Sequence, residues 1–149
     1  MKILFLGIGK TKHKFLIEGI ERYKKLLSSF VKVEEKYLKE ESKDPINAES
    51  DKLIRSIPTG YYKILLDIEG KRLRSEDLAS LIQDHRNSST PGIVFIIGGS
   101  DGVNDKMRKA VDLRISFSGF TMTHQMIRLF LSEQIYRAYT IITNRKYHK

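Results

Sequence analysis

Segments that contain glycine follow three of the apolar runs in the sequence, at residues 66–70, 98–102 and 117–122. Glycine has no Cβ atom, so the backbone there can come close to a flat ligand and offer it N–H and C=O groups. The last segment adds two phenylalanines and a methionine, apolar side chains that suit the face of an adenine ring. Each segment by itself would only turn the chain. Parallel neighbouring strands would bring the three into one crevice, because ligands of open α/β sheets bind outside the carboxyl ends of the strands.

Other nucleotide-binding motifs are incomplete. Residues 9–11 read Gly-Lys-Thr, as at the end of a phosphate-binding loop, but Leu4 stands where that loop needs its first glycine. A dinucleotide-binding fingerprint that began at Gly7 would need a glycine at the position of Lys12. The sequence also lacks the Gly-x-Ser-x-Gly turn of many hydrolases. A nucleotide-dependent enzyme of the Rossmann type is therefore disfavoured, and hydrolysis finds no support.

No metal site is expected. The sequence has no cysteine, and its 4 histidines stand far apart, without the short spacing that binds zinc. Asp67 and Glu69 close an apolar run, but acidic residues at strand ends are common, and we expect both to be exposed. The apolar runs at residues 3–6 and 93–97 are too short for a signal peptide or a membrane span. We therefore expect a soluble, cytoplasmic protein with no metal and no membrane partner.

The elements that must position the glycine-bearing segments alternate between strands and helices. The run at residues 93–97 has no polar residue, which is typical of a strand buried on both faces of a parallel sheet. Between the apolar runs, apolar residues recur at helical spacings of three and four. The pattern predicts one α/β domain over residues 1–149, with a mainly parallel sheet flanked by helices. The expected strands are residues 3–7, 31–38, 61–68, 93–97 and 113–118, and the expected helices are residues 13–30, 48–57, 75–86, 107–111 and 123–144.

The ends of some elements carry their own signals. Glu69 and Gly70 are expected to end the third strand, and Ser75 is expected to cap the next helix with its hydroxyl. Glu76 and Asp77 would then lie at the positive end of the helix dipole. The last expected helix is apolar over more than one stripe. So broad an apolar face favours a partner subunit as well as the sheet.

The charge of the chain points to a polyanionic partner. Lys plus Arg number 27 against 18 for Asp plus Glu, which gives a net charge of +9 and a pI near 9.7. A surplus of this size on a small domain favours nucleic acid. A protein without enzymatic activity would show the same surplus. A non-catalytic RNA-binding or ribosome assembly factor is therefore the alternative to an enzyme.

Several ordered stretches make the sequence recognisable: ILLDIEGK, FIIGGSDG, SFSGFTMTHQM, EQIYRAYTI and the terminal Tyr147-His148-Lys149. They resemble the large-subunit rRNA methyltransferase H family, which are small SPOUT enzymes, and the likeness extends over the whole chain. The resemblance implies methyl transfer from S-adenosylmethionine to N3 of a pseudouridine in 23S rRNA, in an intersubunit stem-loop of the assembled ribosome. It also implies a homodimer and a C-terminal trefoil knot, a feature that is rare among proteins.

The resemblance also assigns residues to the site. The cofactor-binding residues would be Leu66, Gly98, Phe117, Ser118, Gly119, Phe120, Thr121 and Met122. A pseudouridine N3–H is weakly acidic, so a base or a cation must favour its deprotonated form. The candidates for this catalytic role are His124, Arg128, Tyr147 and His148. The basic, aromatic tail could stack on a base and complete the cavity of a partner subunit. The identity of the base, action of the tail in trans, the docking mode and the number of cofactors per dimer stay open.

Two positions depart from the family pattern. Thr123 stands where the family often has proline, which presets the first turn of a helix, so the last helix is expected to begin more loosely. Asp101 lies where relatives vary, and we give it no role.

Overall fold

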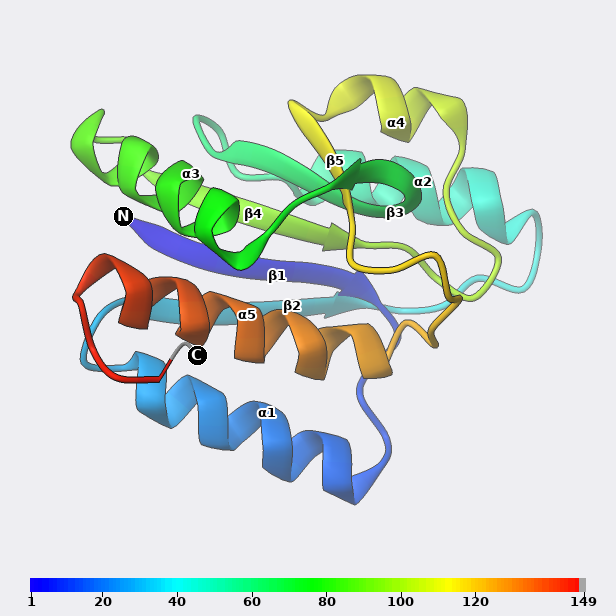
Figure 1. Ribbon diagram of the computed structural model, residues 1–149. Helices are drawn as coiled ribbons and strands as arrows, with labels where there is room; N and C mark the ends of the chain where they lie inside the picture. Colours follow the sequence, from blue (N-terminus) through cyan, green and yellow to red (C-terminus); the bar gives the residue numbers. More distant parts are fainter. Residues whose placement is uncertain (148–149) are drawn as a thin grey trace.

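Parallel strands form one 5-stranded sheet, and helices cover both of its faces (Figure 1). The computed structural model describes residues 1–147. The strands lie in the order β2-β1-β4-β3-β5, and each neighbouring pair is parallel, which confirms the predicted fold class. The strands are β1 (Lys2–Ile8), β2 (Lys32–Leu38), β3 (Tyr62–Arg72), β4 (Gly92–Ile97) and β5 (Leu113–Ser116). The helices are α1 (Lys14–Leu27), α2 (Pro45–Ser56), α3 (Ser75–Asn87), α4 (Asp105–Ala110) and α5 (Met126–Ile142).

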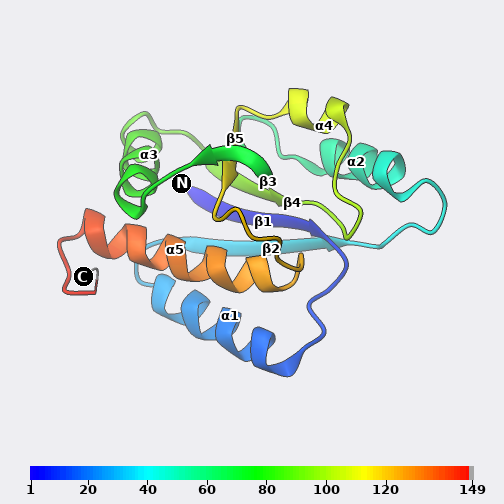
Figure 2. The ribbon, with the colours of Figure 1, turned by 45° about the vertical axis from the view of Figure 1, so that its right-hand side comes forward.

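Two apolar cores, one on each side of the sheet, hold these layers together. In β1, Ile3 and Phe5 point to one face while Leu4 and Leu6 point to the other, because successive side chains of a strand alternate. Helices α1, α3 and α5 cover the first face, and α2 and α4 cover the second (Figure 1 and Figure 2). Every residue of β4 is buried, so a strand at the middle of the sheet has no polar alternation.

Helix α5 lies between α1 and α3 on one face of the sheet (Figure 1). Leu131, Ile135 and Ala138 are fully buried in the core beneath it, and Tyr139 is 1% exposed. Packing on three sides therefore accounts for much of its broad apolar surface. Phe130 is 47% exposed, so part of that surface stays uncovered in a single chain. Within residues 1–147, no helix is long and apolar enough to cross a membrane.

Strand β3 is longer than predicted, and its second half curves around β5 (Figure 1). The predicted end near Gly70 is wrong, because β3 resumes its pairing with β5 at Lys71 after a register shift. Ile115 of β5 pairs with both Leu66 and Lys71, so residues 67–70 pass around it. A Cβ atom on residue 70 would lie 2.6 Å from the backbone N and C atoms of Ile115. This approach between two backbones requires glycine.

Helices α3 and α5 also begin differently from the predictions. Ser75 does not cap α3, because its hydroxyl donates a hydrogen bond to Gln134 Oε1 at 2.8 Å. The cap is made by Asp77, whose carboxylate accepts from the backbone N–H just before the helix at 2.9 Å. Helix α5 begins at Met126, later than predicted, and Thr123 Oγ1 accepts a hydrogen bond from the Met126 N–H at 3.1 Å. Residues 123–125 therefore form a turn before α5, and this turn lies beside the sheet.

Candidate functional site

The three glycine-bearing segments meet at the carboxyl ends of β4 and β5 and at the bend in the middle of β3, and these three strands are neighbours in the sheet. They line a cavity of about 800 Å³. Residues 66–68 form one wall, residues 97–103 a second, and residues 115–118 with 120–125 a third. His13, from the loop after β1, also reaches the cavity. The convergence predicted from the sequence is confirmed.

The glycine loop after β4 is tightly folded. Gly102 has a φ of +84°, in the left-handed region that favours glycine, and its N–H donates to the carbonyl of Gly99 at 3.1 Å. Gly98 has little room for a side chain, since a Cβ atom there would lie 2.9 Å from Val103 Cγ1. At its three glycines, the loop presents backbone groups to the cavity.

The segment between β5 and α5 is held by one serine. Ser118 Oγ accepts a hydrogen bond from the N–H of Phe120 at 3.0 Å, and the Ser118 carbonyl accepts from Ser116 Oγ at 2.8 Å. These bonds close the turn on itself and keep its backbone beside the glycine loop. The shape of this wall therefore comes from short-range hydrogen bonds and not from regular secondary structure.

Most of the predicted cofactor-binding residues line the cavity. Gly119 is the exception, since it faces away from the described wall, and a Cβ atom on it would lie 2.9 Å from the Arg72 guanidinium. Phe120 is 84% exposed, so it stands at the mouth of the cavity and does not form an inner wall. The predicted residues that do line the cavity are Leu66, Gly98, Phe117, Ser118, Phe120, Thr121 and Met122.

His124 lies on the cavity wall in the turn before α5. Its Nδ1 is 3.5 Å from Ser100 Oγ, and its Nε2 is buried with no hydrogen-bond partner among the described residues. Burial, followed by the positive charge of Arg128, lowers the pKa of the imidazole below its ordinary value of 6.5. The ring is therefore neutral at pH 7 and has a nitrogen lone pair that can accept a proton.

Arg128 is fully buried and does not belong to the described wall of the cavity. Its guanidinium donates to the carbonyl oxygens of Ile8 and Gly9 at 2.6 and 2.7 Å and to Thr11 Oγ1 at 2.9 Å. The same group lies over the ring of Tyr37, 3.9 Å from its centroid. These contacts tie the first turn of α5 to the end of β1. The geometry suits a residue that positions α5, not one that touches a ligand in the cavity.

Comparison with known proteins identifies the family. A family model described as "Predicted SPOUT methyltransferase" matches residues 1–148. The chain belongs to the SPOUT methyltransferase family. A protein of Desulfotalea psychrophila named "Ribosomal RNA large subunit methyltransferase H" is 41% identical over 153 residues, and the match covers 100% of both chains. A protein of the same name from Fusobacterium nucleatum is 41% identical over 155 residues, again covering 100% of both chains. These matches confirm the resemblance found in the motifs.

Solved structures of much lower identity share the fold of this SPOUT chain. The crystal structure of a probable methyltransferase from Bordetella pertussis Tohama I has a TM-score of 0.55 at 9% identity, covering 92% of this chain and 95% of that one. A probable methylase family protein from Haemophilus influenzae Rd KW20 has a TM-score of 0.57 at 11% identity, covering 99% of this chain and 70% of that one. At such identities the likeness concerns the fold alone.

Tyr147 packs against the middle of α5 and is not among the residues that line the cavity of the same SPOUT chain. Its ring meets Tyr136 edge-on with centroids 4.8 Å apart, and its hydroxyl donates to Glu133 Oε1 at 3.2 Å. The guanidinium of Arg137 lies 5.0 Å from the centroid of the Tyr147 ring. Helix α5 has 17 residues, so its two ends are about 25 Å apart. The other tail candidate, His148, lies outside the described residues.

The sequence analysis missed three titratable side chains on the cavity wall: His13, Asp67 and Arg108. The expectation that Asp67 is exposed is wrong, because its side chain is 6% exposed and its carboxylate accepts from Arg108 Nε at 3.0 Å. Arg114 lies 3.6 Å from the same carboxylate. A carboxylate that directly follows the apolar run of residues 64–66 was an available signal for Asp67. Nothing local in the sequence marks the other two.

Proposed function

We propose that this chain transfers a methyl group from S-adenosylmethionine to N3 of a pseudouridine in 23S rRNA, in the intersubunit stem-loop of the assembled ribosome. The observation that carries the proposal is the meeting of three glycine-bearing segments around one cavity, at the ends of β4 and β5 and at the bend of β3. Membership of the SPOUT methyltransferases supports the reaction type. The enzyme would act in the cytoplasm, where ribosomes are.

The size and lining of the cavity suit an adenosyl group. Its volume of about 800 Å³ falls among those of ligand pockets, roughly 300–1,000 Å³. Leu66, Ile97 and Phe117 offer apolar contact, and the glycine loop offers backbone groups for the polar edge of a base. When bound, S-adenosylmethionine supplies an electrophilic methyl group on a sulfonium. The proposed cofactor residues are those inferred from the resemblance, with Gly119 shaping its loop and not lining the wall.

His124 is the proposed proton acceptor. Methylation of an imide nitrogen requires the loss of its proton, and a lowered pKa keeps this imidazole neutral at pH 7. Ser100, with its Oγ 3.5 Å from Nδ1, would orient the ring, and Arg128 would hold the first turn of α5 beside it. Arg108, paired with Asp67, places a cation on the same wall. A cation there would stabilise the negative charge that the pseudouridine gains when its N3 proton is removed.

Ribosomal RNA is the proposed substrate. A net charge of +9 on 149 residues attracts a polyanion. Relatives that are 41% identical over their full length are named for the large subunit of ribosomal RNA. The loop of a stem-loop suits an enclosed site, because unstacked bases can be turned out of a single strand. The choice of the pseudouridine N3 atom rests on the motifs that this chain shares with the family.

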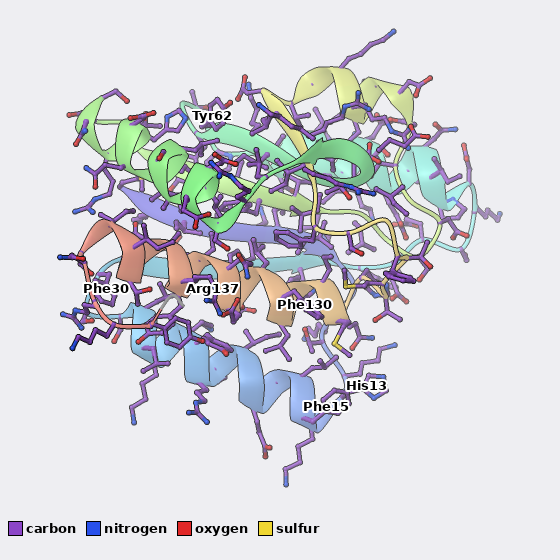
Figure 3. All side chains as sticks on the ribbon, viewed as in Figure 1. His13, Phe15, Phe30, Tyr62, Phe130 and Arg137 are labelled. Atoms are coloured by element: carbon purple, nitrogen blue, oxygen red, sulfur yellow. The ribbon has the colours of Figure 1, made fainter. Side chains whose placement is uncertain are left out.

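We further propose a homodimer in which the tail of one protomer completes the cavity of the other. In one chain Tyr147 packs against Tyr136 and Glu133 of α5 and is not among the residues that line the cavity, so the tail would reach a cavity in a second copy. Phe15, Phe120 and Phe130 are 60%, 84% and 47% exposed. Phe15 and Phe130 lie on α1 and α5, towards the cavity end of the molecule (Figure 3). Apolar side chains in such number favour burial against a partner.

The trefoil knot implied by the resemblance is also part of the proposal. Its support is the path of residues 67–70, which curve around β5 with Gly70 against the backbone of Ile115. Stretching the unfolded chain by its two ends tests this. A knot leaves the stretched chain shorter than the roughly 3.3–3.6 Å per residue of a fully extended chain. Extension to the full length would contradict a knot.

Calorimetry and a methylation assay test the proposed function together. We expect the pure protein to bind S-adenosylmethionine, and to methylate 23S rRNA in ribosomes taken from cells that lack this gene. Mass analysis of nuclease fragments should place the added methyl group on a single pseudouridine. Binding of ribosomes without binding of S-adenosylmethionine would instead identify a non-catalytic RNA-binding or assembly factor. Methylation of another nucleotide would overturn the assigned target.

A further inference from the structure

A cluster of arginine and aromatic side chains lies at the end of the molecule opposite the cavity, where α1, α3 and α5 end (Figure 1). Phe30, just after α1, stacks on Tyr139 of α5 with ring centroids 5.7 Å apart (Figure 3). The guanidinium of Arg145 lies 4.5 Å from the centroid of Phe30, and that of Arg86 lies 5.7 Å from the centroid of Tyr139. We call these four residues the arginine–aromatic cluster.

Both arginines of the cluster are exposed, and their charges are not neutralised by a carboxylate. Within residues 1–147, neither guanidinium forms an ion pair. The carboxylate of Glu133, on the same helix, already accepts hydrogen bonds from Arg137 and Tyr147. Burial raises the pKa of Tyr139 to about 12, so this ring stays neutral and adds no negative charge. Two positive charges are therefore available to an external anion.

The aromatic rings favour binding of phosphate by these arginines. A guanidinium that lies against a ring keeps its N–H groups at the edge of its plane, where they can bind phosphate in a bidentate way. The contact also limits the motion of a long side chain, so less conformational entropy is lost when an anion binds. Lys25, in the last turn of α1, and Lys146, next to Arg145 in the sequence, are exposed as well.

We propose that the arginine–aromatic cluster binds backbone phosphates of the RNA substrate, at a surface separate from the cavity. The proposal rests on the proposed function, because it takes RNA to be the substrate. Along α5, Tyr139 of the cluster lies about 18 Å from Ile127, which lines the cavity of the same chain. The cluster therefore contacts RNA outside the target nucleotide of that cavity. Its role is to add affinity and position the substrate, without taking part in methyl transfer.

Salt-dependent RNA binding tests the proposal directly. The probe is a fluorescein-labelled RNA hairpin of about 20 nucleotides, titrated by fluorescence anisotropy from roughly 50 to 200 mM salt. The test protein carries Arg86→Gln with Arg145→Gln. The matched control carries Lys43→Gln with Lys109→Gln, which removes the same charge from exposed positions elsewhere. Each lost phosphate contact should reduce the slope of log K against log salt by roughly 0.7–0.9, and so by roughly 1.5 for the arginine pair.

The expected result is a loss of RNA affinity of about tenfold or more in the arginine pair at about 100 mM salt, against less than about twofold in the control. Arg145→Lys keeps the charge but loses the planar fork, so it should keep the slope and lose part of the affinity. With ribosomes as substrate, Arg86→Gln alone, at the arginine on α3 and not beside the tail, should raise KM while kcat stays unchanged. Calorimetry should show unchanged binding of S-adenosylmethionine.

Other outcomes separate this proposal from the proposed function. If the arginine pair binds RNA like its control while its melting temperature falls, the two side chains only stabilise helix ends, and the surface is refuted. In that case methylation by the unaltered protein still supports the proposed function. If the unaltered protein methylates no ribosomes, the proposed function fails, whatever the cluster binds. If it binds no hairpin at all, the phosphate surface fails with it.

Discussion

The two ends of the sheet are built from different groups. Where β4 and β5 end and β3 bends around β5, the chain forms glycine-bearing segments, so backbone and apolar atoms line the cavity together with a few titratable side chains. At the other end α1, α3 and α5 finish, and arginines lie against aromatic rings. This difference follows from the topology, because parallel strands leave loops at one end, and helix C-termini with partial negative charge, which favours arginine, gather at the other. One end suits enclosure of a small molecule and the other suits an extended anion.

The largest effect on methylation is expected from the C-terminal tail. Deletion of residues 147–149 should abolish methylation, a loss of roughly 1,000-fold or more, if the tail completes a partner's cavity as proposed. Calorimetry should show binding of S-adenosylmethionine within a few-fold of the unaltered protein. Tyr147→Phe, which keeps the ring and loses the hydroxyl contacts with Glu133 and Tyr23, is the milder companion. Equal loss of methylation and cofactor binding after deletion would mean that the tail acts through folding of its own chain.

A histidine at each end allows a matched comparison of chemistry. His124→Asn should slow methylation about 100-fold through loss of the proton acceptor. His85→Asn is the control, since His85 packs against Tyr62, with ring centroids 4.1 Å apart, at the far end of the sheet. A similar slowing in both variants would remove His124 from the mechanism.

The pH dependence of methylation sharpens the same comparison. Because the pKa of His124 is lowered from 6.5, the unaltered enzyme should stay active down to that pH and lose rate only below it, as the imidazole becomes protonated. In the unfolded chain the imidazole of His124 has its ordinary pKa, so protonation favours the unfolded state. The free energy of unfolding should therefore fall as the pH drops through 6.5. His124→Asn should flatten the acid limb of the rate profile, and persistence of that limb would assign it to another group.

Arg128 tests whether the start of α5 is held by one side chain. Arg128→Lys should lower the free energy of unfolding by about 2 kcal/mol, because an ammonium group cannot bond three oxygens and stack on Tyr37 as the guanidinium does. Arg22→Lys, at an exposed position of α1, should change it by less than about 0.5 kcal/mol. Urea unfolding measures both. Equal stabilities would show that the buried contacts do not fasten the helix.

The smallest expected effect is a change in cofactor affinity at the glycine loop. Gly98→Ala should weaken binding of S-adenosylmethionine about tenfold, because the added methyl group meets Val103 Cγ1 at 2.9 Å and shifts the loop. Val103→Ala combined with Gly98→Ala removes the clash and should restore most of the affinity. Calorimetry compares the two. Failure of the second substitution to rescue binding would place the cause in the backbone of the loop.

The sequence predicts best where a feature depends on neighbouring residues. The apolar run of β4 and the glycines after it are local signals, and they led correctly to the parallel sheet and to a cavity at its edge. The helix around Leu131 and Ile135 was likewise visible from its spacing. Its true start at Met126 was not, because the Met126 N–H donates to Thr123 Oγ1 and closes a turn where the first helical turn was expected.

Contacts between residues that are far apart in the chain could not be predicted from the sequence. Asp67 is buried because Arg108, 41 positions away, pairs with it. Arg128 is drawn inward by the carbonyl of Ile8, 120 positions away. In each case a charged residue that usually lies in solvent is buried because a partner satisfies it. No local pattern predicts such a partner, and it was found only when the folded chain placed the two side by side.

The curve of residues 67–70 around β5 constrains the order in which the chain assembles. During synthesis these residues leave the ribosome before β5 exists, so they cannot take their final position around a strand that has not yet been made. A nascent chain that stops before Leu113 can form the central strands, but it lacks the last wall of the cavity. The cavity can therefore be completed only late in synthesis, after the final quarter of the chain has left the ribosome and packed against the sheet.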